Sequence, residues 1–100
     1  MTKIDEIIKA IDDKLGKDIV KINLNNAIVD YFIITSANAP NHAQSIADKV
    51  LEICDQEGYE VLGVEGYSEG KWILIDLNDI VVHIFTEEQR AFYDIERLWA

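Results

Sequence analysis

Hydrophobic residues recur along this chain with two different periods, which divide it into helices and strands. Apolar positions three to four residues apart predict helices at 4–15, 40–57 and 87–99. Alternating or continuous apolar runs predict strands at 19–24, 31–35, 59–64, 71–76 and 80–85. The order helix, two strands, helix, three strands, helix indicates a single-domain α/β sandwich over residues 1–100, with a five-stranded mixed sheet flanked by helices.

Most of the predicted helix boundaries carry their own signals. Thr2-Lys-Ile-Asp5 and Thr86-Glu-Glu-Gln89 each place an acid or amide three residues after a hydroxyl, which is the capping-box pattern. Pro40 suits the first residue of the middle helix. Gly16 and Gly58 suit the residues at which the first two helices stop.

The last two predicted strands are apolar on both faces. Because side chains alternate across a strand, Trp72, Leu74 and Asp76 share one face of the sheet, and Ile73 and Ile75 share the other. Two amphipathic helices cover roughly one face of a five-stranded sheet. The other face is therefore left to the short last helix or to another molecule.

Aromatic residues gather in the second half of the chain. Tyrosine and tryptophan are enriched where binding energy concentrates in protein interfaces, although large aromatic residues also complete cores. The contact-surface and core interpretations both stay open for this set, which comprises Tyr67, Trp72, Phe85, Tyr93 and Trp99.

Charge narrows the choice of partner. The 19 acids against 9 lysines and arginines give a net charge of −10, which repels phosphate backbones and anionic lipid surfaces and attracts basic proteins. We therefore expect no direct sequence-specific nucleic-acid binding and no membrane binding.

No apolar run approaches the ~20 residues that span a bilayer, and the single Cys54 fits a reducing compartment. The expected location is the cytoplasm.

No arrangement of side chains predicts a metal or cofactor site. His42, Cys54 and His83 are isolated in the sequence, without paired zinc-ligand spacing. Cys54 falls on the apolar face of the middle helix, which indicates a core position. His83 alternates with apolar residues, so it is either a hydrogen-bonded histidine of the sheet or a ligand or acid-base group.

Several consecutive motifs resemble the ribosomal silencing factor family, also called the Iojap family. The similarity runs from the first helix to Trp99 in one register, and matching spacings across several motifs are more specific than any single short pattern. The motifs are Asp30-Tyr-Phe-Ile-Ile, Glu65-Gly66, Trp72-Ile-Leu-Ile-Asp76, Asp79-Ile-Val-Val-His-Ile-Phe85, Arg90 and Tyr93-Asp-Ile-Glu-Arg-Leu-Trp99.

The resemblance implies a non-catalytic repressor of translation, without cofactors and homodimeric when free. Such a factor binds the large ribosomal subunit through ribosomal protein fourteen, blocks joining with the small subunit and lowers translation when nutrients are scarce. The acidic charge fits docking on a basic ribosomal protein amid repelling RNA.

The resemblance also implies a set of partner-binding residues. Trp72 and Leu74 would be apolar anchors, and Asp76 and Asp79 would meet basic side chains. Alternatively, Asp79 is only a turn residue and Asp76 only the end of a strand. The full set is Glu65, Gly66, Tyr67, Lys71, Trp72, Leu74, Asp76, Asp79, His83 and Phe85, with Tyr93, Leu98 and Trp99 as closing-segment contacts.

The chain departs from the family pattern in two places. Residues 37–42 replace a Gly-Asn-Ser turn and a following glutamine, which removes a helix-capping serine for which Pro40 can compensate. Lys71 stands where the family has a basic residue. It keeps the positive charge, but it lacks the planar guanidinium group of arginine, which can donate two parallel hydrogen bonds.

An enzyme of the nucleotidyltransferase type is the competing interpretation, because the order of elements is similar to that of nucleotidyltransferase domains. Such an enzyme needs a Gly-Ser turn for phosphate and closely spaced acids for Mg²⁺. Asp76 and Asp79 are candidates for the acids, but the chain has no Gly-Ser pair. We therefore expect no catalytic residues.

Overall fold

The computed structural model describes residues 2–25 and 28–93, and the elements follow the predicted order. The helices are α1 (Lys3–Asp13), α2 (Pro40–Glu57) and α3 (Glu87–Tyr93). The strands are β1 (Lys17–Asn23), β2 (Tyr31–Ala37), β3 (Gly63–Glu65), β4 (Trp72–Asp76) and β5 (Ile80–Thr86). None of the helices within these residues is long and apolar enough to cross a membrane.

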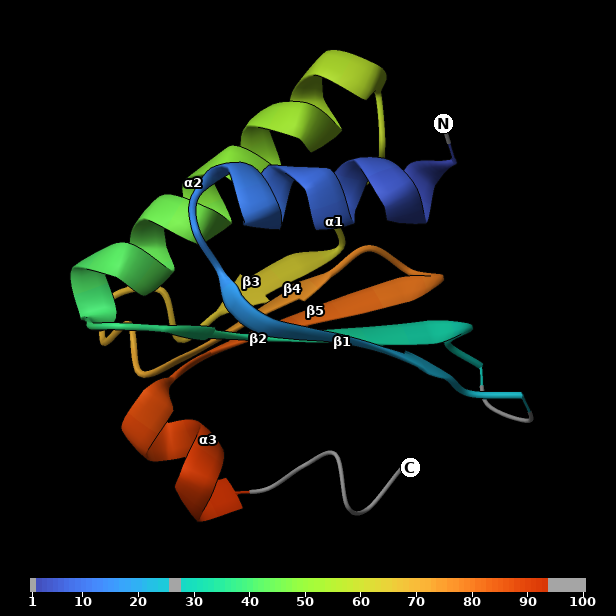
Figure 1. Cartoon of the computed structure of the whole chain (residues 1–100). Helices are drawn as coiled ribbons and strands as arrows, with labels where there is room; N and C mark the ends of the chain where they lie inside the picture. Colours follow the sequence, from blue (N-terminus) through green and yellow to red (C-terminus); the bar gives the residue numbers. More distant parts are fainter. Residues whose placement is uncertain (1, 26–27, 94–100) are drawn as a thin grey trace.

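The five described strands form one mixed sheet in the order β1-β2-β5-β4-β3. The central pair, β2 and β5, runs parallel, and the outer pairs are antiparallel. The helices α1 and α2 lie side by side over one face of this sheet, whereas α3 lies on the other side (Figure 1). The α/β fold with a five-stranded mixed sheet is confirmed.

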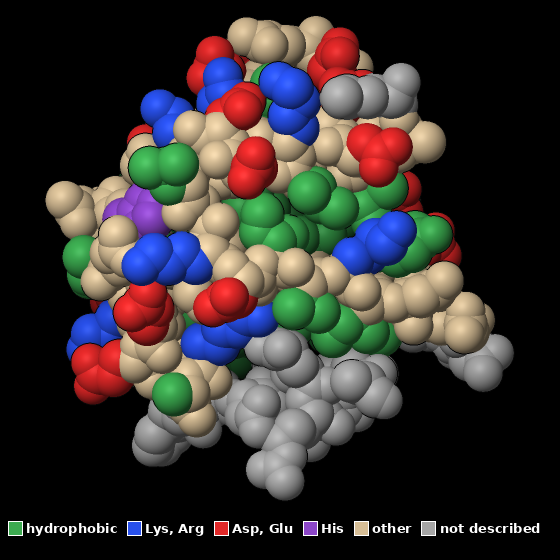
Figure 2. All heavy atoms as spheres, in the orientation of Figure 1, with side chains coloured by type: hydrophobic (Ala, Val, Ile, Leu, Met, Phe, Trp, Pro, Cys, Tyr) green, Lys and Arg blue, Asp and Glu red, His purple; other side chains and the backbone are tan. Residues whose placement is uncertain are grey.

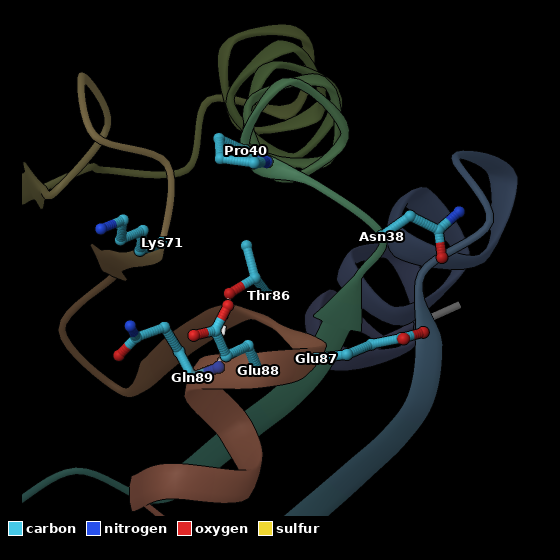
Figure 3. A pocket seen from close by; sticks show the side chains of 7 residues that line it. All are labelled: Asn38, Pro40, Lys71, Thr86, Glu87, Glu88 and Gln89. Atoms are coloured by element: carbon cyan, nitrogen blue, oxygen red, sulfur yellow. Dashed lines mark hydrogen bonds between the residues drawn. The ribbon is translucent and has the colours of Figure 1, made fainter.

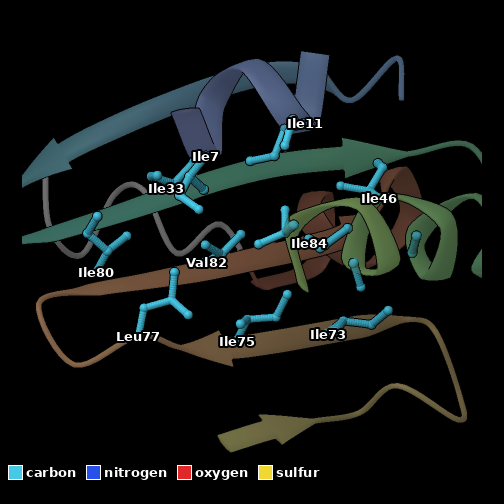
Figure 4. Packing of buried hydrophobic residues seen from close by; sticks show 14 of the residues in the cluster. Ile7, Ile11, Ile33, Ile46, Ile73, Ile75, Leu77, Ile80, Val82 and Ile84 are labelled. Atoms are coloured by element: carbon cyan, nitrogen blue, oxygen red, sulfur yellow. The ribbon is translucent and has the colours of Figure 1, made fainter. Parts of the chain in front are cut away.

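The main core fills the space between the sheet and the two long helices (Figure 4). Alternate side chains of β5 and of its neighbour β4 point to this side of the sheet. They are fully buried, namely Val82 and Ile84 of β5 and Ile73 and Ile75 of β4. The isoleucines of α1 and α2 meet them there, as does the buried Cys54. Removing this apolar surface from water is the main source of stability of the fold.

A second, smaller cluster lies on the opposite face of the sheet. Its fully or nearly buried members are Ile22, Leu24, Ile34 and Phe85. Trp72 packs against it as a partly buried residue. The sheet is therefore apolar on both faces, as the alternation predicted.

The boundaries of α1 and α2 match the predicted signals except at Gly16. The Thr2 capping box is formed, Pro40 begins α2, and Gly58 ends it in the left-handed conformation with φ 72°. At the end of α1, Leu15 rather than Gly16 takes the positive φ of 61°. Gly16 is needed for a different reason, because a Cβ atom there would collide with Ile11 and lie 2.7 Å from the Thr35 hydroxyl.

Two further predictions were partly wrong. The strand expected at 59–64 is only Gly63–Glu65. Tyr59 still belongs to the end of α2, because its N–H bonds to the Cys54 carbonyl at 2.8 Å. At α3, the Gln89 N–H donates to the Thr86 hydroxyl at 3.4 Å. The Thr86 N–H instead bonds to the Lys71 carbonyl at 2.9 Å, so the Gln89 side chain does not complete the expected capping box.

We expect Gly66→Ala to destabilise the protein far more than Gly58→Ala. Both glycines have positive φ, 77° and 72°, but only at Gly66 would a Cβ atom collide with backbone, at the Trp72 carbonyl oxygen. Gly58→Ala should cost about 1 kcal/mol and Gly66→Ala more than about 2 kcal/mol of unfolding free energy. Urea denaturation of the two variants measures the difference, and equal losses would contradict this account of the turn.

Candidate functional site

The residues predicted to bind a partner come together mainly on one side of the sheet, which we call the α3 face. This is the face opposite α1 and α2, where α3 contacts β5 and β2. Its side chains come from four strands in register, and they are Val20, Ile22, Phe32, Ile34, Trp72, Leu74, Asp76, Val81, His83 and Phe85.

On β4, the α3 face is partly accessible to solvent. Trp72, Leu74 and Asp76 are each partly exposed, whereas their β5 neighbours His83 and Phe85 are buried. Trp72 stacks on Phe85, with ring centroids 4.8 Å apart and an angle of 28° between the planes. The tryptophan is therefore held by the second apolar cluster without being sealed inside it.

His83 lies beneath this surface. It is 3% exposed, and its Nδ1 accepts a hydrogen bond from the indole Nε1 of Trp72 at 3.2 Å. Burial lowers the pKa of His83 from 6.5 to about 4, so the ring is neutral at pH 7. Of the two alternatives, the structure shows a hydrogen-bonded histidine of the sheet, and the ring is too deeply buried to offer a direct contact in this conformation.

Asp76 and Glu65 place carboxylates beside these apolar residues. Glu65 is exposed on the edge strand β3 and pairs with Leu74 across the ladder. Asp76 ends β4, and its Oδ1 accepts the Asn78 N–H at 2.9 Å. Asp76 thus has the turn role expected of an aspartate there, and its partly exposed carboxylate also borders the α3 face.

Other residues of the predicted set are tied to the helical layer. The Tyr67 hydroxyl donates to Asp48 of α2 at 2.7 Å, which raises the pKa of Tyr67. Asp79 forms an ion pair with Lys3 of α1, with 2.7 Å between Nζ and Oδ1. The structure therefore separates these two side chains from the group around Trp72.

Gly66 and Lys71 flank the connection between β3 and β4, at the end of the sheet near α3. At Gly66 the backbone passes so close to the Trp72 carbonyl oxygen that a Cβ atom would not fit. Lys71 lines a cavity together with Thr86. Of the closing-segment contacts, Leu98 and Trp99 lie outside the described residues, and so does the side chain of Tyr93.

Sequence reasoning assigned no role to two features of this face. Phe32 meets the His83 ring edge-on at 4.6 Å, which the alternation of the 31–35 strand could have indicated. Arg90 fastens α3 to the sheet, since its guanidinium donates to the Asp18 carbonyl at 2.7 Å and to the Ser36 hydroxyl at 2.8 Å. No spacing in the sequence points to those two acceptors, because they become neighbours only when the strands pair.

A cavity of about 310 Å³ lies at the carboxyl ends of the parallel strands β2 and β5 (Figure 3). Ligands of open α/β sheets bind at such a place. Among the described residues that line it, Lys71 is the single basic one, beside Glu87 and Glu88, and the lining excludes Asp76 and Asp79. Within residues 2–25 and 28–93, no group of three or more His, Cys, Asp or Glu residues could hold a metal ion.

The outer surface of the helical layer mixes charges of both signs. Figure 2 shows acidic and basic side chains interspersed over the helices, with hydrophobic side chains in a band between them and the sheet. A groove of about 420 Å³ between α1 and α2 has the same character, because Lys9 and Lys49 lie there among Glu6, Asp13 and Glu57. A hydrogen bond with Glu6 raises the pKa of Glu57. The described lining of this groove is mostly charged, unlike the aromatic and apolar α3 face.

The lowered pKa of His83 predicts that the protein loses stability in mild acid. A histidine whose pKa is lower in the folded than in the unfolded state stabilises the fold above pH 6.5, and this stabilisation is lost as the pH falls towards 4. The difference between these two pKa values corresponds to about 3 kcal/mol of unfolding free energy. His83→Phe removes the titrating group, so the unfolding free energy of the wild type relative to this variant should fall by up to that amount between pH 6.5 and 4. Parallel stability curves would contradict the prediction.

Comparison with known proteins shows which family the sequence resembles. The family model described as "Ribosomal silencing factor during starvation" matches residues 1–100. A ribosomal silencing factor of Halalkalibacterium halodurans is 37% identical over 94 residues, which cover 92% of this chain and 80% of the relative. The chloroplastic Iojap protein of Zea mays is 33% identical over 69 residues, 69% of this chain and 30% of that longer protein.

A solved crystal structure has the same fold as this chain. The crystal structure of a Chromobacterium violaceum protein superimposes with a TM-score of 0.94 and 29% sequence identity, and covers 97% of this chain and 82% of the other. Because the family model spans the whole chain and the first relative is similar over most of its own length, the assignment does not depend on one short motif. The chain belongs to the ribosomal silencing factor family, whose members are non-catalytic, ribosome-binding regulators of translation.

Proposed function

We propose that this protein binds the large ribosomal subunit through ribosomal protein fourteen and thereby blocks joining with the small subunit. The result is repression of translation, above all when nutrients are limiting. Family membership supports the ribosomal target. The observation that carries the choice of docking surface is the partly exposed group Trp72, Leu74 and Asp76 beside a buried aromatic cluster.

The contacts proposed for this surface follow from its chemistry. Trp72 and Leu74 are apolar anchors, because a tryptophan held at the edge of a packed cluster can bury most of its ring against a partner at little entropic cost. Asp76 and Glu65 border them and are suited to meet basic side chains. Asp79 already pairs with Lys3, so we assign it to the turn, and we assign Gly66 and Tyr67 to the support of the β3–β4 connection.

Electrostatics favours a basic protein over RNA as the direct partner. The net charge of −10 attracts a basic ribosomal protein and is repelled by ribosomal phosphates. Specific protein contacts would then outweigh non-specific RNA contacts. Steric blocking needs no chemical step, only an affinity sufficient to compete with subunit joining.

The proposal has three further parts, of which the homodimer comes from the family resemblance, the location from the composition, and the topology from the order of strands and helices. The free protein is a homodimer, and it acts in the cytoplasm. The strands and helices have a nucleotidyltransferase-like topology, but the described lining of the cavity at the ends of β2 and β5 has one lysine against two glutamates, which is poor for phosphate. The proposed activity is therefore binding alone.

We expect Trp72→Ala to weaken binding to purified large ribosomal subunits at least about thirtyfold, as loss of a central tryptophan anchor typically does. Co-sedimentation with a titrated concentration of subunits measures the affinity, and urea denaturation establishes how much of the variant is folded. The same variant should fail to reduce the yield of joined ribosomes in a subunit-association assay.

Leu15→Ala is the matched control for that experiment. Leu15 is 75% exposed in the turn after α1, away from the α3 face, so its removal should leave binding unchanged. Wild-type protein that does not sediment with large subunits at micromolar concentration would overturn the proposed function. Equal binding by Trp72→Ala would overturn the choice of the α3 face.

Asp76→Asn tests the contribution of charge separately from structure. The asparagine oxygen can still accept the Asn78 N–H, so the turn should keep its hydrogen bond while the carboxylate charge disappears. We expect a several-fold weaker affinity for large subunits, and a smaller loss of affinity when the salt concentration rises from about 50 to about 200 mM. An unchanged salt dependence would show that Asp76 does not face a basic partner group.

A further inference from the structure

We propose that His83 is a positioning residue for docking, which fixes the orientation of the Trp72 indole without touching the partner itself. The inference deepens the proposed function and rests on it. It assigns a role to a histidine that is buried in the same face of the sheet as the proposed anchors.

The hydrogen bond between the two rings defines the chemical state of His83. An indole Nε1–H can only donate, so the His83 Nδ1 at 3.2 Å must be the acceptor and carry a lone pair. The proton of the neutral ring is therefore on Nε2. A protonated imidazole would have no acceptor to offer, and burial disfavours that form.

Stacking and hydrogen bonding restrain different motions of the Trp72 ring. The stack on Phe85, at 4.8 Å and 28°, fixes the plane of the indole but allows it to slide and turn within that plane. The bond to His83 Nδ1 fixes the direction of the Nε1 edge. Together they select one orientation of a ring that stays partly exposed on β4.

His83 is itself held in place by its neighbours. Phe32 meets it edge-on with centroids 4.6 Å apart, and the Phe85 ring lies nearly parallel to it, at 10° and 6.2 Å. In β5 its Cα position is opposite Leu74 of β4 and Ile34 of β2. A rigid acceptor in an apolar setting makes a stronger and more directional hydrogen bond than one in water.

The cost of this arrangement argues for a role beyond packing. No described residue accepts a hydrogen bond from the buried Nε2 of His83. A buried donor without an acceptor lowers stability, and a phenylalanine at this place in the apolar cluster would avoid that cost. The gain from keeping histidine is the acceptor for Trp72, that is, a binding residue ordered before the partner arrives.

Two substitutions separate the acceptor from the ring. His83→Phe keeps an aromatic ring but has no acceptor. His83→Asn lacks the ring but can place Oδ1 on Cγ, where Nδ1 was attached. Each variant is assayed for unfolding free energy, for binding to purified large ribosomal subunits, and for solvent exchange of the Trp72 indole N–H by NMR. The indole signal is identified by its absence in Trp72→Phe.

We expect His83→Phe to be at least as stable as the wild type at pH 7, to exchange its Trp72 indole proton at least about tenfold faster, and to bind large subunits about tenfold more weakly. His83→Asn, although less stable because of the lost ring, should recover most of the affinity per folded molecule. Stability and binding that change in opposite directions are the signature of a positioning residue.

Wild-type binding and indole exchange in His83→Phe would overturn the inference. So would losses of binding that merely follow losses of stability in both variants, because that is the result for a purely structural residue. If wild-type protein does not bind large subunits, the proposed function fails on its own. The indole exchange then still decides whether His83 orders Trp72, and unchanged exchange would reject it.

Discussion

The structure depends on one constraint, which is that the central strand β5 is buried along its entire length. All seven of its residues lack substantial solvent exposure, so both faces of the sheet need apolar cover. The helices α1 and α2 supply it on one side. On the other side the chain provides a smaller cluster and the short α3, and β4, next to the edge strand β3, keeps Trp72, Leu74 and Asp76 partly accessible. The proposed docking surface thus lies where the second cover is incomplete among the described residues.

The same constraint explains why a polar ring lies in an apolar layer. His83 occupies a position of β5 where its neighbours across the sheet are Leu74 and Ile34. Its burial keeps it neutral, and only the neutral ring can accept the indole proton of Trp72. Packing, protonation state and the orientation of a surface tryptophan are therefore linked through one hydrogen bond. In this way the buried interior of the sheet can influence the proposed docking surface on β4.

Most of the fold could be predicted from the sequence because its signals are local. Capping at Thr2, the helix start at Pro40 and the strands that are apolar on both faces are encoded in short stretches, and they indicated the order of elements and the sharing of faces. The errors arose where a contact with a residue outside the expected element decided the outcome. Gly16 is needed because Ile11 and Thr35 crowd it, not because its backbone ends α1. Tyr59 is held by the last turn of α2, which shortens the expected strand to β3.

For the site, the sequence by itself determined which residues are available: the family motifs, the acidic charge, and the alternation that places Trp72, Leu74 and Asp76 together. Tertiary structure decided how they are used. Pairing of β4 with β5 set Trp72 on Phe85 and against His83, while docking of α1 and α2 drew Asp79 to Lys3 and Tyr67 to Asp48. Local patterns specify the direction of a side chain relative to its own strand or helix. Which partner satisfies it depends on elements far away in sequence, and these become neighbours only when the sheet and its helices assemble.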